Sequence, residues 1–145
     1  MIPPARTAAQ RKADVVAKLE SEVDLWVASA DATGNAYLVP LSYYWDGSAL
    51  TISTPRTSRT ATNLTRAGEA RVALGGTRDV VMIDGTVEVG ADPELQERHA
   101  RATGFDPRTL DDYVYLRITP RAIQAWREEN ELAGRWLMRD GEWLG

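Results

Sequence analysis

The part of the chain richest in groups that could hold an anionic ligand runs from Ser53 to Leu64. It combines serine and threonine hydroxyls with Arg56 and Arg59, and Thr57-Ser58 offers an N-cap for a helix. Hydroxyls, guanidinium groups and the free N–H groups of a helix N-terminus together favour phosphate binding. The run therefore indicates a phosphate site, and a capped surface helix with exposed arginines is the alternative interpretation.

The charge of this region differs from that of the whole chain. The 145 residues carry 17 Lys+Arg against 21 Asp+Glu, a net charge of −4, which argues against nucleic acid as a partner. Between residues 56 and 79, arginines outnumber carboxylates by five to two, which makes the segment locally basic. The five are Arg56, Arg59, Arg66, Arg71 and Arg78. A small anionic ligand is therefore expected here.

The chain lacks the residues that a metal site or a thiol nucleophile would need. The chain has no cysteine and one histidine, His99, so we expect no metal site and no thiol nucleophile. His99 falls in a predicted helix over residues 92–103 among charged neighbours, which predicts an exposed polar side chain. No carboxylate pair stands out, and no catalytic residue is assigned.

The elements that would position these residues are mostly short strands. Apolar and branched residues predict strands over residues 24–29, 36–45, 49–54, 70–75, 79–83, 85–89 and 113–119, with 123–126 as one more. Helices are predicted over residues 8–19, from the Thr57-Ser58 cap to Gly68, and over 92–103. Val114, Leu116 and Ile118 are expected to point inward, and the tail after Trp126 is not assigned.

Strands at hairpin spacing with few helices predict a fold that is mainly β, a small antiparallel barrel with flanking helices and one domain over residues 1–145. No segment approaches the roughly 20 apolar residues of a membrane span, so a cytoplasmic protein without a membrane partner is expected. The large aromatic rings outnumber what one small barrel can hold, and some are expected at the interface of a homodimer. They are Trp26, Tyr43, Tyr44, Trp45, Tyr115, Trp126, Trp136 and Trp143.

An ordered set of short motifs runs through the predicted barrel. They are Gly34-Asn35-Ala36, Asp46-Gly47, Ser53-Thr54, Ser58-Arg59-Thr60, Asn63-Leu64 and Gly85-Thr86-Val87-Glu88. In this order, over roughly residues 8–127, the chain resembles the pyridoxamine 5′-phosphate oxidase-like split-barrel flavoproteins. Ile118-Thr119-Pro120, with Trp126 after it, is similar to the final strand of the branch that includes deazaflavin-dependent reductases.

This resemblance implies a homodimer of six-stranded antiparallel split barrels, with flavin sites at the subunit interface. The cofactor phosphate would rest on the turn between the third strand and the next helix, and the ring system would lie along the second strand. The cofactor-binding residues that the resemblance implies are Val39, Pro40, Leu41, Ser53, Thr54, Arg56, Ser58, Arg59, Thr60, Asn63, Arg78 and Asp79.

Two positions depart from the family pattern. Thr60 stands where many relatives have a lysine that neutralises the phosphate, and Arg56 is a candidate to replace it. Asp79 follows Arg78 where the family often has glutamine, and a carboxylate cannot donate a hydrogen bond as an amide does.

The implied function is an oxidoreductase in which the cofactor carries a two-electron hydride transfer to a small organic substrate. The cofactor is FMN or, alternatively, the 5-deazaflavin coenzyme (factor 420), whose acidic tail Arg66, Arg71 and Arg78 could bind. Two alternatives stay open. One is a non-catalytic flavin- or tetrapyrrole-binding carrier or sensor on the same fold, and the other is a dimeric barrel without cofactor that serves as an interaction module.

Overall fold

The computed structural model describes all 145 residues of the chain, which form eight β-strands and three α-helices. The strands are β1 (Asp24–Ala30), β2 (Ala36–Trp45), β3 (Leu50–Pro55), β4 (Glu69–Leu74), β5 (Val80–Val89), β6 (Tyr113–Trp126), β7 (Trp136–Arg139) and β8 (Glu142–Trp143). The helices are α1 (Ala8–Ser21), α2 (Arg59–Ala67) and α3 (Pro93–Thr103), with 3-10 turns η1 (Pro107–Thr109) and η2 (Glu129–Glu131). No helix has both the length and the apolar character needed to cross a bilayer.

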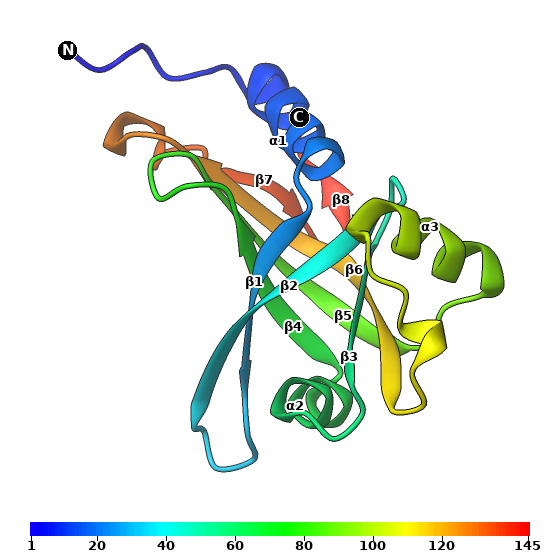
Figure 1. Ribbon diagram of the computed structural model, residues 1–145. Coiled ribbons are helices and arrows are strands. Elements are labelled where there is room, and N and C mark those ends of the chain that lie inside the picture. The colour runs from blue at the N-terminus through cyan, green and yellow to red at the C-terminus, as the bar shows by residue number, and fades with distance from the viewer.

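Six of the strands close into an antiparallel barrel, as predicted. The sheet order is β3-β2-β1-β4-β5-β6, and a ladder between β3 and β6 joins the two edges (Figure 1). Strands β7 and β8 extend the sheet beyond β6. Closure removes the free edges that an open sheet of these strands would expose.

The second half of the barrel has fewer and longer strands than the sequence predicts. Residues expected to form separate strands on either side of Asp84 belong to one strand, β5, and those on either side of Pro120 belong to β6. A β-bulge allows this continuity, because Asp84 pairs with Ala122 and Gly85 with Pro120, so that Arg121 is the extra residue. Proline is tolerated in a sheet at such a bulge.

The core fills the barrel and is closed at one end by α1. Val114, Leu116 and Ile118 of β6 are buried, as predicted, in a single cluster of apolar side chains. Val15 and Leu19 of α1 join the same cluster. The N-terminal helix therefore completes the barrel core.

Buried charged groups fix the N-terminal segment to the segment after β6. Arg11 is buried and donates from Nη1 to the carbonyl oxygens of Ala125, Glu131 and Gly134. Arg6 donates to the Glu131 carboxylate from Nη2 at 2.7 Å and from its backbone N–H at 2.9 Å. These bonds hold α1 to the end of β6 and to the segment before β7, and Figure 1 shows α1 beside β7 and β8.

The two remaining helices lie at other places on the barrel. Helix α2 follows β3 directly and leads into β4, and in Figure 1 it lies at the end of the barrel opposite α1. Helix α3 connects β5 to β6 and packs mainly against β2 and β3. Strands β2 and β3 thus run between the two helices, and the candidate site lies on them.

Candidate functional site

The N-terminus of α2 forms at the position that the sequence predicts. Ser58 is the N-cap, and its Oγ accepts a hydrogen bond from the Ala61 N–H at 3.1 Å. The same oxygen lies 3.0 Å from Thr54 Oγ1 at the end of β3. The backbone N–H groups of Arg59 and Thr60 make no hydrogen bond within the chain. The turn therefore presents hydroxyls and free N–H groups in one place, which suits an anion.

Thr60 and Asn63 differ in what they offer to this turn. Both side chains are buried beneath α2. Asn63 Nδ2 donates to Ser29 Oγ of β1 at 3.1 Å, so this amide holds the helix to the barrel. Because the Thr60 side chain is buried, only the backbone N–H of this residue is available to an anion at the turn.

The five arginines of the basic segment divide by their partners. Arg71 is paired with Asp84 at 2.6 Å, and Arg78 is paired with Glu128 at 2.9 Å. The other three contact only neutral groups. Arg56 Nη2 donates to the Tyr113 carbonyl, the Arg59 guanidinium lies 5.7 Å from the Tyr37 ring centroid, and Arg66 Nη2 donates to the Ala30 carbonyl. The uncompensated positive charge of the basic segment is therefore concentrated around α2.

The structure does not bring Arg78 and Asp79 to α2 within one chain. They lie in the turn between β4 and β5, whereas α2 leads into the opposite end of β4. Asp79 forms ion pairs there with Lys18 at 3.1 Å and with Arg127 at 3.2 Å.

A pocket of about 280 Å³ lies beside β2 and β3. Four of the residues predicted to bind the cofactor line it, namely Pro40, Leu41, Ser53 and Thr54. It is lined by Pro40, Leu41, Ser42, Ser53, Thr54, Pro55, His99, Thr103, Phe105 and Tyr113. None of these side chains is an acid, a lysine or an arginine. Val39 does not line this pocket, and like Leu41 it is partly buried against the barrel core. The pocket thus connects the predicted ring position on β2 with the hydroxyls at the end of β3.

The prediction that His99 is exposed was wrong. Its side chain is 1% exposed, and its ring packs edge-on against Tyr115 with the centroids 5.6 Å apart. Neither ring nitrogen has a hydrogen-bond partner. Burial lowers the pKa of His99, with a smaller opposing effect from Asp106. Its spacing of four residues from both Leu95 and Thr103, on one helix face, was the available signal.

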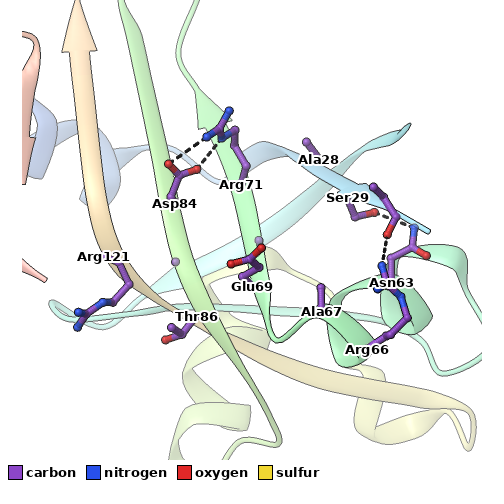
Figure 2. Close-up of a pocket in the computed structure, with 13 residues that line it drawn as sticks. Ala28, Ser29, Asn63, Arg66, Ala67, Glu69, Arg71, Asp84, Thr86 and Arg121 are labelled. Atoms are coloured by element: carbon purple, nitrogen blue, oxygen red, sulfur yellow. Dashed lines mark hydrogen bonds and ion pairs between the residues drawn. The ribbon is translucent and has the colours of Figure 1, made fainter. Parts of the chain in front are cut away.

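A larger groove of about 640 Å³ lies on the outside of the barrel (Figure 2). Residues of β1, α2, β4, β5 and β6 line it, and the Arg71–Asp84 ion pair lies on one wall. Asn63 and Arg66 enter it from α2. Of the three arginines considered for an acidic cofactor tail, Arg66 and Arg71 line this groove and Arg78 does not.

Several solved structures share this fold. General stress protein 26 from Bacillus anthracis matches with a TM-score of 0.66 and 16% identity, over 81% of this chain and 95% of that one. An F420 reductase matches with a TM-score of 0.63 and 16% identity, over 74% and 93%. A heme-binding protein from Mycobacterium smegmatis matches with a TM-score of 0.68 and 15% identity, over 94% of this chain and 58% of that one.

The sequence itself gives the family. No curated protein sequence matches the chain. The family model described as pyridoxamine 5′-phosphate oxidase matches residues 12–127, which include the whole barrel and both helices that flank the candidate site. The chain therefore belongs to the pyridoxamine 5′-phosphate oxidase family.

Proposed function

We propose that the protein is an oxidoreductase that binds FMN, or alternatively the 5-deazaflavin coenzyme, with the cofactor phosphate at the N-terminus of α2. The observation that carries the proposal is the free N–H groups of Arg59 and Thr60 beside two arginines, Arg56 and Arg59, that have no carboxylate partner. An anion at this turn would satisfy both the N–H groups and the positive charge.

The chain's own residues would hold the cofactor at three points. Ser58 and Thr54 hydroxyls and the Arg59 guanidinium bind the phosphate, and Arg56 compensates for the lysine that Thr60 replaces. Pro40 and Leu41 of β2 lie along the ring system, beside the 280 Å³ pocket. When bound, the flavin supplies two-electron hydride transfer, and the protein supplies position and exclusion of water.

The same proposal includes a homodimer. Arg78 and Asp79 lie too far from α2 in one chain to join its site, so they take part only from the second protomer. Asp79 is already held by Lys18 and Arg127, and its carboxylate offers a flavin ring an acceptor and no donor.

The two cofactors differ in what they need from the larger groove. The similarity to an F420 reductase supports the deazaflavin. However, Arg71 is neutralised by Asp84, which leaves Arg66 and Arg121 as the groove's arginines without a carboxylate partner. This modest positive charge favours FMN, which has no acidic tail.

A second candidate function is binding of a tetrapyrrole without catalysis, which the similarity to a heme-binding protein supports. His99 is the only histidine that could serve as a heme ligand, and its surroundings argue against this function. The pocket that His99 lines has a volume of about 280 Å³, below the roughly 300–1,000 Å³ of pockets for drug-sized ligands, and does not admit a porphyrin.

Titration of the apo-protein separates these functions. FMN, the deazaflavin coenzyme and hemin are added separately at moderate ionic strength, with ligand fluorescence or absorbance as the signal. We expect micromolar or tighter binding of one flavin and no specific hemin binding. Binding of neither flavin would contradict the proposal and favour an interaction module.

A further inference from the structure

Unpaired polar atoms are concentrated on one face of the ladder between β3 and β6. Thr51 is opposite Arg117, and Ser53 is opposite Tyr115. Because side chains alternate along a strand, these four lie on the same, outward face. Buried atoms without a partner include Thr51 Oγ1, Tyr115 OH, Arg117 Nε and both nitrogens of His99, and only Arg11 Nε lies elsewhere.

Helix α3 meets this region through one buried residue. His99 is the only buried residue of the helix. An unpaired buried polar group costs stability, and native proteins keep such groups where water, a ligand or a reaction uses them. The imidazole of His99 is therefore the group in this region that most needs an explanation.

The pocket beside His99 determines which ligands fit. Phe105, Tyr113, Leu41 and Pro40 supply aromatic and apolar walls, and no lining side chain carries a full charge at neutral pH. A charged ligand would lose its hydration here without gaining an ion pair. The pocket volume of about 280 Å³ limits the ligand to a small molecule.

Thr103 and His99, which α3 contributes to the pocket, differ in what they can offer a ligand. The Thr103 hydroxyl lies 2.8 Å from the His99 carbonyl oxygen and 3.1 Å from that of Phe105, so it is already used. Burial lowers the pKa of His99, which keeps the imidazole neutral with one N–H donor. Asp106, the acidic group that acts on the pKa of His99, is bound by Arg108 at 2.8 Å, and neither ring nitrogen of His99 has a hydrogen-bond partner.

We propose that this pocket binds a small uncharged molecule with an aromatic ring and a carbonyl oxygen, and that the oxygen accepts a hydrogen bond from His99. The binding site stands on this geometry alone. The further assignment, that the bound molecule is the substrate beside the cofactor ring, rests on the proposed function. Such a substrate differs from the phosphate ester after which the family is named, because the pocket has no cation for a phosphate.

The first test uses benzamide as the probe and His99 as the reporter. His99 is the only histidine of the chain, so histidine labelled with ¹³C and ¹⁵N gives one set of imidazole signals. We expect benzamide to shift these signals saturably, and benzoate and benzylamine to bind at least about tenfold more weakly. Unshifted His99 signals up to the solubility limit of benzamide, or equal binding of the charged probes, would overturn the proposal.

Two substitutions test the hydrogen bond itself, with benzamide binding followed on the ligand signals. His99→Leu fills the position with an apolar side chain and removes the donor, and we expect about tenfold weaker binding. His99→Gln keeps an N–H donor, and we expect binding within about threefold of the wild type. Equal binding by His99→Leu would contradict the role of the imidazole. If His99→Leu fails to fold, the wild-type titration and His99→Gln still decide.

A third measurement separates this proposal from the proposed function. FMN is titrated by its own fluorescence, with and without saturating benzamide. Simultaneous binding of both supports the substrate assignment. Competition would show that the pocket takes the cofactor ring and would overturn that assignment. Benzamide binding without any flavin binding would contradict the proposed function and leave the His99 site supported.

Discussion

Arg59 differs from most arginines of this chain in its surroundings. Its guanidinium lies over the Tyr37 ring, with no carboxylate within ion-pair distance, at the first position of α2. Arg71 and Arg78, in contrast, are held by Asp84 and Glu128. A free guanidinium beside free backbone N–H groups can bind an oxyanion without first breaking an ion pair, so Arg59 is the residue on which a phosphate site depends most.

Replacement of Arg59 by alanine tests this site. We expect Arg59→Ala to weaken FMN binding by about 1.5–3 kcal/mol, the typical loss of a hydrogen bond to a charged group. The residue is exposed and unpaired, so stability should change by less than about 0.5 kcal/mol. Fluorescence titration and urea unfolding measure the two effects. Arg101→Ala, an exposed ion-paired arginine of α3, is the control. An unchanged dissociation constant for FMN in Arg59→Ala would contradict the assignment of the phosphate to this turn.

At the residue scale, the sequence was informative where the chemistry is local. Ser58 caps α2 as predicted, because an N-cap depends on neighbours within three residues. The burial of His99 was missed because it depends on α3 packing against β2 and β3 and on the contact with Tyr115 of β6. The charged neighbours of His99 in the sequence indicated exposure instead. Arg78 and Asp79 are separated from α2 because the helix precedes β4 and the two residues follow it, at the other end of the strand. The sequence alone does not show how far each of these two ends lies from the candidate site.

At the scale of elements, strands β1 to β4 and all three helices were predicted nearly to their ends. Local signals such as the Asp46-Gly47 turn and the Asp92 cap mark these ends. The continuity of β5 and β6 was missed because Asp84 and Pro120, both of types depleted in strands, indicate breaks when taken alone. Gly85, next to Asp84, is instead paired with Pro120 across the bulge. A Cβ at Gly85 would lie 2.6 Å from the Thr119 carbonyl oxygen, which explains why glycine fits there.

The connection between the N-terminal segment and η2 depends on pH. The hydrogen bond from Arg6 lowers the pKa of Glu131 to about 2, and burial opposes this effect. Because the folded pKa lies below the ordinary value of about 4.3, the stabilisation is complete above that value and is lost as pH falls towards 2. We expect the ionised Glu131 to contribute about 2–3 kcal/mol at neutral pH.

Urea unfolding at pH 6 and at pH 2.5 measures this contribution. Wild-type protein should lose more free energy of unfolding between these pH values than Glu131→Gln, which cannot titrate. Glu129→Gln, an exposed neighbour on the same turn, should behave as the wild type. The same pH dependence in Glu131→Gln and in the wild type would assign acid sensitivity to other carboxylates.

At the scale of the whole molecule, one surface is more apolar than a monomer requires. Leu38 is 58% exposed and Trp26 is 50% exposed. Trp26 pairs with Pro40, and Ala28 with Leu38, so the four side chains share one face of the β1–β2 ladder. Pro40 also lines the candidate pocket. We expect a second copy of the chain to cover this face, which would place the site at the subunit interface.

Sedimentation equilibrium tests this expectation. Wild-type protein should be a dimer at micromolar concentration, and Leu38→Glu should shift it to monomer because a carboxylate would be buried without a partner. Leu110→Glu, at an exposed apolar residue near η1, should leave the dimer unchanged. A monomeric wild type would contradict both the proposed homodimer and the proposed role of Arg78 and Asp79 in the site of the second protomer.

Closure of the barrel by β3 and β6 also has a kinetic consequence. Helix α2, strands β4 and β5 and helix α3 separate these two strands along the chain, and contacts between such distant segments form slowly during folding. Ser53 and Thr54 belong to this ladder and also line the pocket. A ligand bound there would hold together the two segments that meet last. Amide hydrogen exchange along β3 should therefore slow on ligand binding more than exchange in β7, and the bound protein should unfold more slowly.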